Sequence, residues 1–253
     1  MFLTAKVFLI VIPLVFLAGL VDAIGGGGGL ISLPAYLLAG LPTHMAIATN
    51  KLSSACGTSV ATAKFIKEKQ MNLLLAVPTV ICAFAGSFLG AKLSLRTDES
   101  KLQLIMIPVL FLAAFFVLNR KMFASRGSET TVIDRRVYIV ASLASFIIGI
   151  YDGFYGPGTG TFLIIALTVF GRLAPKKSNA QAKIINLTTN LTSLVVFIMG
   201  GQVVWTLGIA AALSNMAGGY IGSVLALSKG EKIIRPVILV VLVLLAVKIL
   251  TGY

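Results

Sequence analysis

The stretch Gly19-Leu-Val-Asp22-Ala-Ile-Gly25-Gly-Gly-Gly-Gly29 interrupts an apolar segment, and Gly149-Ile-Tyr-Asp152-Gly-Phe-Tyr-Gly156-Pro-Gly158-Thr-Gly160 does the same in the second half. Each places an aspartate ahead of a glycine-rich break. Downstream, an offset of 132 residues (183 − 51) pairs Lys51 with Lys183, and the same offset pairs Gly86 with Gly218. The chain is therefore predicted to contain two copies of one module. Matching glycine-interrupted hydrophobic segments in two halves point to a transporter's binding site.

The composition places the chain in a lipid bilayer. Its mean hydropathy is +1.00, 58% of its residues are hydrophobic and only 11% are charged, which lies outside the range of soluble domains. Apolar runs long enough to cross a hydrocarbon core of ~30 Å recur along the whole length. We therefore expect residues 1–118 to form a first transmembrane repeat, residues 119–136 a basic cytoplasmic linker, and residues 137–253 a second transmembrane repeat.

The net charge of +13 comes from cations in short loops beside apolar segments. Nucleic-acid binders instead carry such residues on an amphipathic or aromatic-interleaved face. We therefore expect the cations to orient the chain in the bilayer, and we expect no nucleic-acid partner. Cys56 and Cys82 lie inside apolar segments and give neither a disulfide framework nor metal-ligand spacing. The sequence indicates no cofactor and no metal site, and it leaves the oligomeric state open.

Ten apolar segments are predicted, five in each half. They cover about residues 6–24, 30–40, 44–63, 71–91, 102–118, 137–152, 160–171, 178–199, 205–227 and 236–252. A repeat with an odd number of segments that is inserted twice must face opposite ways. The expected fold class is therefore an all-α integral membrane protein built from two inverted repeats of five hydrophobic segments each, with glycine-rich broken or re-entrant helices.

The basic loops support this inversion. The loop after the third segment carries three lysines between positions 64 and 69, whereas the matching loop around Gln202 has no charge. When all basic loops are placed in the cytoplasm, 14 Lys and Arg residues lie inside and five outside, with Lys51 and Lys183 left within segments. Both termini are then predicted to lie outside.

The glycine breaks are candidate anion sites. Each leads into a segment of only ~10–12 apolar residues, too few to span a bilayer as a straight helix. Unpaired backbone N–H groups and the positive end of a helix dipole then point into the protein centre and attract anions. The alternative is a flexible break or close helix packing. The candidate substrate-binding glycines are Gly26, Gly27, Gly28, Gly156 and Gly158.

Two lysines and three asparagines complete the candidate substrate site. Lys51 and Lys183 lie well inside their segments, where a cation is costly unless it faces a cavity or reaches the interface. They would either neutralise a substrate anion from the two sides or extend to the nearer interface. Asn50, Asn186 and Asn190 are the preferred neutral ligands among the polar residues of the same helices, where the alternative role is hydrogen bonding between packed helices.

Asp22 and Asp152 are the acids that lie inside apolar segments. A carboxylate within a membrane is a candidate for ion coupling, and a proton is the candidate coupling ion. The alternative is that both side chains cap the glycine turns. The Gly86-x-x-x-Gly90 and Gly218-x-x-x-Gly222 pairs are better explained by close helix contacts than by substrate contacts.

In combination these features resemble the sulfite exporter TauE/SafE family of membrane transporter proteins. The similar motifs are Gly-Leu-Val-Asp22 leading into the glycine run, Ala48-Thr-Asn50-Lys51-Leu-Ser, Ala182-Lys183-Ile-Ile-Asn186-Leu-Thr-Thr-Asn190-Leu and Gly218-Gly-Tyr-Ile-Gly222. The resemblance extends over essentially the whole chain. It implies secondary transport, in the export direction, of small anions such as sulfite, sulfonates and related organosulfur or carboxylate anions across a bacterial plasma membrane.

The function expected from the sequence is thus the movement of a small oxyanion by alternating access at the interface between the repeats. An anion channel is a second hypothesis, since its pore would need no coupling carboxylate. An intramembrane enzyme is a third, and the chain lacks the paired acids, the His/Glu metal cluster and the His beside a nucleophile that such an enzyme would use. We therefore expect no enzymatic activity.

Overall fold

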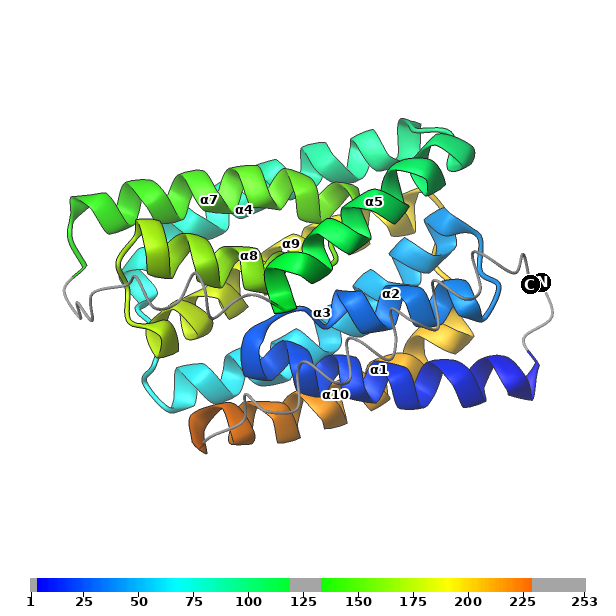
Figure 1. The fold of residues 1–253 in the computed structure, drawn as a ribbon, viewed down its shortest axis with the longest axis horizontal. Helices are drawn as coiled ribbons and strands as arrows, with labels where there is room; N and C mark the ends of the chain where they lie inside the picture. The colour runs from blue at the N-terminus through cyan, green and yellow to red at the C-terminus, as the bar shows by residue number, and fades with distance from the viewer. Residues whose placement is uncertain (1–3, 119–132, 229–253) are drawn as a thin grey trace.

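The computed structural model describes residues 4–118 and 133–228. The regular secondary structure in these residues is all helical. The helices run along one bundle (Figure 1). Their bounds are α1 Ala5–Gly25, α2 Gly29–Leu38, α3 Thr43–Lys67, α4 Leu73–Arg96, α5 Glu99–Leu118, α7 Arg135–Phe154, α8 Thr159–Ile165, the π-helical turn η1 Ala166–Phe170, α9 Pro175–Met199 and α10 Trp205–Ser228. Nine expected segments coincide with these elements, and the tenth, at 236–252, lies outside the described residues, as does most of the expected linker.

Local sequence signals explain several of these boundaries. Asn72 accepts a hydrogen bond from the backbone N–H of Leu75 at 2.8 Å and so caps the start of α4. Asp134 caps α7 in the same way through the N–H of Val137 at 2.9 Å. Each cap satisfies one of the N–H groups that a helix leaves unpaired at its first turn. Pro175 opens α9, where a missing N–H costs nothing.

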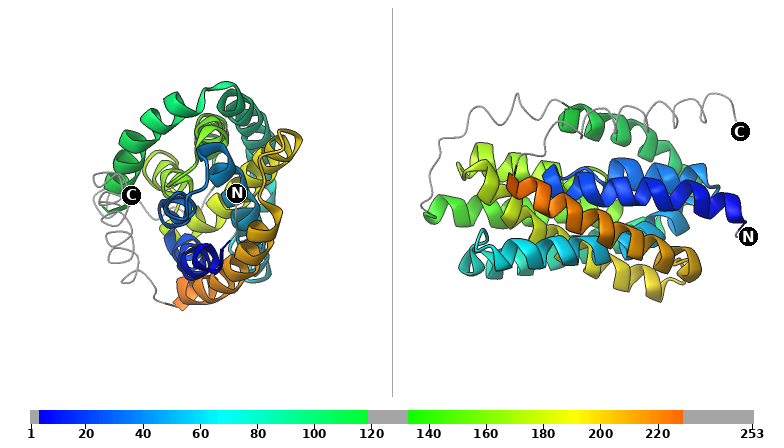
Figure 2. Two further views of the ribbon diagram at one scale, coloured as in Figure 1. Left: turned by 90° about the vertical axis from the view of Figure 1, so that its right-hand side faces the viewer. Right: turned by 90° about the horizontal axis from the view of Figure 1, so that it is seen from below.

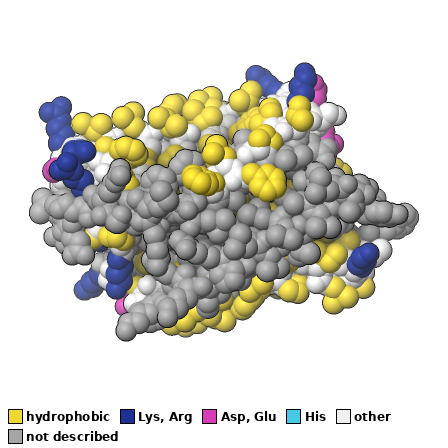
Figure 3. Space-filling view, viewed as in Figure 1, with side chains coloured by type: hydrophobic (Ala, Val, Ile, Leu, Met, Phe, Trp, Pro, Cys, Tyr) yellow, Lys and Arg dark blue, Asp and Glu magenta, His cyan; other side chains and the backbone are white. Residues whose placement is uncertain are grey.

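Five of the described helices are long and apolar enough to cross a membrane: α1, α4, α7, α9 and α10. Their outer faces carry large apolar side chains, such as Leu9 and Leu74, each 75% exposed. Figure 3 shows hydrophobic side chains along the visible sides of the molecule and Lys and Arg side chains at its two ends. This distribution suits a protein that is surrounded by lipid along its sides and by water at its ends.

The short helices α2 and α8 lie inside the bundle (Figure 2). All side chains of α2 from Leu30 to Tyr36 are buried, and those of α8 are largely buried as well. Each begins at a glycine break, where Gly26 and Gly27 have φ angles of 77° and 91°, and Gly156 and Gly158 have φ angles of 99° and 85°. Residues with side chains rarely adopt such angles, so glycine is what allows the chain to turn back within the bundle.

The halves of the chain exchange their packing partners. Helix α1 of the first half packs along α10 of the second, and α7 of the second half packs along α4 of the first. A β-carbon at Gly218 would overlap the carbonyl oxygen of Phe16, and one at Gly86 would overlap that of Phe146. The prediction that these glycines serve close helix contact is therefore confirmed. The same backbone approach is made twice, at matched positions of the two halves.

Helix direction reverses between the halves. In Figure 1, α1 and α3 run from right to left, whereas α7 and α9 run from left to right. Three of the basic loops come together at one end of the bundle. There Lys69 and Lys177 line one surface hollow, and the guanidinium of Arg136, at the start of α7, donates to the carbonyl of Phe170 at 3.1 Å.

Candidate functional site

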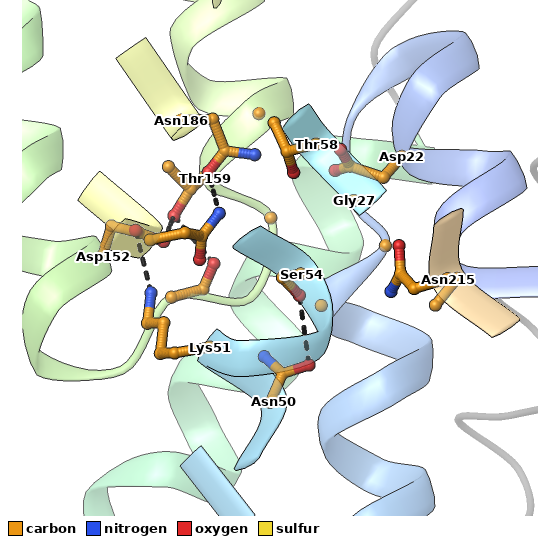
Figure 4. Close-up of a pocket in the computed structure, with 17 residues that line it drawn as sticks. Asp22, Gly27, Asn50, Lys51, Ser54, Thr58, Asp152, Thr159, Asn186 and Asn215 are labelled. Atoms are coloured by element: carbon orange, nitrogen blue, oxygen red, sulfur yellow. Dashed lines mark hydrogen bonds and ion pairs between the residues drawn. The ribbon is translucent and has the colours of Figure 1, made fainter. Parts of the chain in front are cut away.

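A polar cavity lies at the centre of the bundle, between the glycine breaks and the helices α3, α9 and α10 (Figure 4). Both halves of the chain contribute to it, as expected for a site at an interface between repeats. It is lined by Ala18, Asp22, Gly27, Gly28, Gly29, Asn50, Lys51, Ser54, Thr58, Asp152, Gly156, Gly158, Thr159, Gly160, Asn186, Asn190 and Asn215. Its free space is about 20 Å³, enough for roughly one water molecule. An oxyanion therefore needs the walls to move apart.

Two ion pairs join the halves crosswise. The Nζ of Lys51 lies 2.8 Å from Oδ2 of Asp152, and these side chains are 1% and 2% exposed. The Nζ of Lys183 lies 3.0 Å from Oδ2 of Asp22 and also contacts the carbonyl oxygen of Asp22, with side chains 0% and 18% exposed. Each half therefore supplies one lysine and one aspartate, and each lysine is neutralised by the other half. Neither lysine side chain extends to the protein surface.

The two ion pairs lie toward opposite ends of the bundle. Lys51 is eight residues beyond Thr43 at the start of α3, and Lys183 is eight beyond Pro175 at the start of α9, so each lies ~12 Å from the start of its helix. Because α3 and α9 run in opposite directions, these distances are measured from opposite ends of the bundle. The other residues that line the cavity on α3 and α9 include Ser54, Thr58, Asn186 and Asn190, which lie deeper along both helices.

The glycine breaks meet back to back beside the cavity. A β-carbon at Gly26 would overlap the backbone N of Thr161, and one at Gly160 would come within 2.9 Å of the Cα of Gly26. The hydroxyl of Thr161 donates to the carbonyl of Gly25 at 3.2 Å. The contact leaves no room for a side chain at either position, so close packing accounts for glycine here.

Amide groups supply the neutral donors of the site. The Oδ1 of Asn50 accepts from the Ser54 hydroxyl at 3.3 Å, and the Oδ1 of Asn186 accepts from the Nδ2 of Asn190 at 3.2 Å. These bonds use the amide oxygens, whereas the Nδ2 atoms of Asn50 and Asn186, at the cavity, donate to none of the residues that the structure describes. Amide donors of this kind bind oxyanions without a fixed charge.

The carboxylate of Asp152 also orders its own glycine break. Its Oδ1 accepts a hydrogen bond from the hydroxyl of Thr159 at 2.6 Å, and the same hydroxyl lies 2.7 Å from the carbonyl oxygen of Gly156. A residue that pairs with Lys51 thus also links the two sides of the break. The two roles considered from the sequence, ionic partner and turn support, are compatible in one side chain.

Most candidate residues from the sequence line this cavity. Those that do are Asp22, Gly27, Gly28, Asn50, Lys51, Asp152, Gly156, Gly158, Asn186 and Asn190. Gly26 and Lys183 lie beside the lining, where Gly26 packs against the second break and Lys183 holds Asp22.

Sequence reasoning did not single out Asn215 and Thr159. Asn215 is the one asparagine in α10, and a lone amide in an apolar segment is the signal that could have found it.

The described residues hold no group of three or more His, Cys, Asp and Glu side chains that could bind a metal ion. The chemistry on offer is ionic and hydrogen-bonding: two lysines, two carboxylates and a set of amides around a small space. These groups offer charges and hydrogen bonds to a charged small molecule. Together with five apolar helices of spanning length, this site defines a membrane transporter as the class of protein.

Comparison with known proteins gives the family. Residues 11–249 match the family described as Sulfite exporter TauE/SafE, and the chain belongs to it. It is 37% identical over 237 residues to the Probable membrane transporter protein YfcA of Escherichia coli strain K12, covering 92% of this chain and 86% of that protein. It is 35% identical over 236 residues to a Probable membrane transporter protein of Haemophilus influenzae, covering 92% and 90%. No solved structure matches the chain. The family is one of membrane transporters rather than enzymes.

Proposed function

We propose that this protein is a secondary transporter that exports small anions of the sulfite, sulfonate, organosulfur or carboxylate class by alternating access. The cavity lies at the interface of two inverted repeats, residues 1–118 and 137–253, which are joined by a cytoplasmic linker at residues 119–136. Inversion is supported by the opposite directions of α1 and α7 and of α3 and α9. It is also supported by the exchange of packing partners between the halves.

The crossed ion pairs are the observation that carries this proposal. Alternating access needs one closure on each side of a central site, and Lys51–Asp152 and Lys183–Asp22 lie toward opposite ends of the bundle. Each pair ties a helix of one repeat to the break of the other. Relative motion of the repeats would separate the members of one pair while the other pair holds, and this would open the cavity to one side at a time.

The same pairs explain how an anion is bound and released. An anion that enters competes with a carboxylate for the lysine, which compensates the charge of the anion. When the anion departs, the carboxylate pairs with the lysine again, so no lone cation is left buried. The amides of Asn50, Asn186 and Asn190 supply additional donors that carry no charge. A site that is neutral when empty favours release as well as binding, which a transport cycle requires.

Charge balance makes a proton the coupling ion in this scheme. The two lysines and two aspartates sum to zero, so one bound monoanion leaves one negative charge uncompensated in a region of low dielectric constant. Protonation of the displaced carboxylate, Asp22 or Asp152, restores neutrality. Anion and proton would then cross together, and the pH gradient would drive or oppose the anion's movement.

An anion channel is the alternative, and the ion pairs weigh against it. A channel in this bundle would need a continuous open path, whereas the cavity has free space for roughly one water molecule and two inter-repeat pairs beside it. We further propose the bacterial plasma membrane as the location, with both termini outside. The meeting of three basic loops at one end of the bundle supports that orientation.

Flux measurements in proteoliposomes test this proposal. We expect purified protein to exchange labelled sulfite, methanesulfonate or lactate across the membrane, and to accumulate at least one of them when a pH gradient is imposed. Asp22→Asn and Asp152→Asn together should leave exchange of the anion but remove its accumulation, and the single variants show which carboxylate is responsible. Glu68→Gln, which removes a surface carboxylate paired with Lys64, is the matched control. Accumulation that persists with both aspartates replaced would remove them as the coupling groups.

A further inference from the structure

We propose, resting on the function above, that the oxyanion binds at the first glycine break, on the backbone N–H groups of Gly27, Gly28 and Gly29 and the side-chain amide of Asn215. The second break would then serve to position Lys51 and Asp152 instead of contacting the anion. The substrate site is therefore asymmetric although the chain is a repeat.

The start of α2 offers donors that the protein leaves unused. Gly27, Gly28 and Gly29 all line the cavity, and their N–H groups make no hydrogen bond to any described residue. The carbonyls of Gly27 and Gly28 accept from Leu30 and Ile31, at 3.0 and 2.9 Å, so the turn is fixed with these N–H groups at its open end. The ten-residue helix α2 adds the positive end of its dipole.

Asn215 is the independent observation that points to a ligand. This side chain of α10 lines the cavity and is only 4% exposed. Its amide makes no hydrogen bond within the residues that the structure describes. A buried amide without a protein partner is destabilising unless a molecule in the cavity completes its hydrogen bonds. Figure 4 shows Asn215 reaching from α10 toward Gly27, on the side of the cavity away from Lys51 and Asp152.

Neighbouring glycines make room for this amide. A β-carbon at Gly57 of α3 would overlap the Oδ1 of Asn215, and one at Gly19 of α1 would lie 2.7 Å from the same atom. Two helices therefore lack side chains where the amide sits. The arrangement places a hydrogen-bonding side chain, not a packing residue, between α1, α3 and α10.

The second break lacks a counterpart of Asn215 at the matching position of the repeat. The repeat offset of 132 places Ala83 opposite Asn215 (215 − 132), so no amide can reach that break from this position of α4. Two hydroxyls beside the second break are engaged, because the Thr159 hydroxyl is bonded to Asp152 and the Tyr151 hydroxyl donates to the carbonyl of Pro157 at 2.6 Å.

The ion pair nearest to the proposed site is Asp22–Lys183. A β-carbon at Gly28 would lie 2.7 Å from the Cβ of Asp22, so an anion held by these N–H groups is next to that carboxylate and its lysine. Lys183 supplies the compensating cation, and Asp22 is the carboxylate that a proton neutralises when the anion binds.

Binding measurements on Asn215→Leu, which keeps the approximate shape of the side chain without its donors, test the inference. We expect the affinity of the purified protein for sulfite to fall by about 10- to 100-fold, the range for hydrogen bonds to a charged group, while the melting temperature without anion stays the same or rises. Asn215→Asp, of the same size, should lower the affinity further because it adds a negative charge. Thr62→Val is the control, since the Thr62 hydroxyl is buried and unpartnered among the described residues but lies outside the cavity lining.

Three outcomes decide the question. Unchanged sulfite affinity in both Asn215 variants, with normal binding by the wild type, overturns this site and leaves the transport proposal standing. A lower melting temperature in Asn215→Leu with unchanged affinity assigns the residue to packing and overturns the site as well. Absence of binding of sulfite, methanesulfonate and lactate by the wild type would remove the proposed substrate class and this site together.

Discussion

The buried pair between Lys51 and Asp152 should be strongly coupled in stability, and removing one partner should cost more than removing both. The atoms are 2.8 Å apart and the side chains are 1% and 2% exposed. At an effective dielectric constant of about 20, their attraction is about 6 kcal/mol. Asp152→Asn leaves the ammonium of Lys51 buried without its counter-ion, which typically costs about 3–5 kcal/mol. Lys51→Met should cost a similar amount, because it strands the carboxylate.

A double-mutant cycle measures this coupling. We expect Lys51→Met with Asp152→Asn to recover most of the lost stability, which gives a coupling energy of about 3 kcal/mol in detergent. The surface pair Lys64–Glu68, at 3.0 Å and with side chains 26% and 42% exposed, is the control and should give a far smaller coupling, because solvent screens it. Asp22–Lys183 should fall between them, because Asp22 remains 18% exposed. A coupling for Lys51–Asp152 no larger than that of the surface pair would refute the reasoning.

Two further predictions concern topology and packing. Cysteines introduced at Lys67 and Gln202, in a background without Cys56 and Cys82, should react with a membrane-impermeant maleimide from opposite sides of the membrane, and labelling from one side alone would contradict the inverted repeats. Gly218→Ala should lower stability by about 1–3 kcal/mol in thermal unfolding, because its methyl group overlaps the Phe16 carbonyl, whereas Ala217→Leu on the exposed face should change little. Equal stability in the two variants would show that the α1–α10 contact adjusts freely.

The helices were predictable because their signals are local. The expected segment at 30–40 corresponds to α2 at Gly29–Leu38, and that at 160–171 corresponds to α8 with η1, which ends at Phe170. Apolar runs of spanning length and glycine breaks decide these boundaries from a few neighbouring residues. The candidate residues were predictable for a related reason, since charged and amide groups are rare inside membrane segments and most of them face the central polar cavity.

The pairing of these residues could not be predicted from the sequence. Asp22 could pair with Lys51 of its own half or with Lys183 of the other, and the repeat offset is compatible with both. The choice depends on the exchange of packing partners that sets α1 against α10 and α7 against α4. Asn215 escaped detection because its counterpart in the first half is Ala83, so comparison of the repeats gave no signal for it.

The crossed arrangement also bears on the energetics of the proposed cycle. Transport at useful rates needs inward-open and outward-open states of similar free energy, since a large difference would trap the protein in one of them. The two inverted copies that we propose would provide near equality, because opening either side would separate a lysine from an aspartate of the other repeat. The departures from symmetry then set the bias: Asp22 is more exposed than Asp152, and Asn215 has only Ala83 as its counterpart. Both differences lie at the first glycine break, so the anion and the more accessible carboxylate, Asp22, would both act on the Asp22–Lys183 pair.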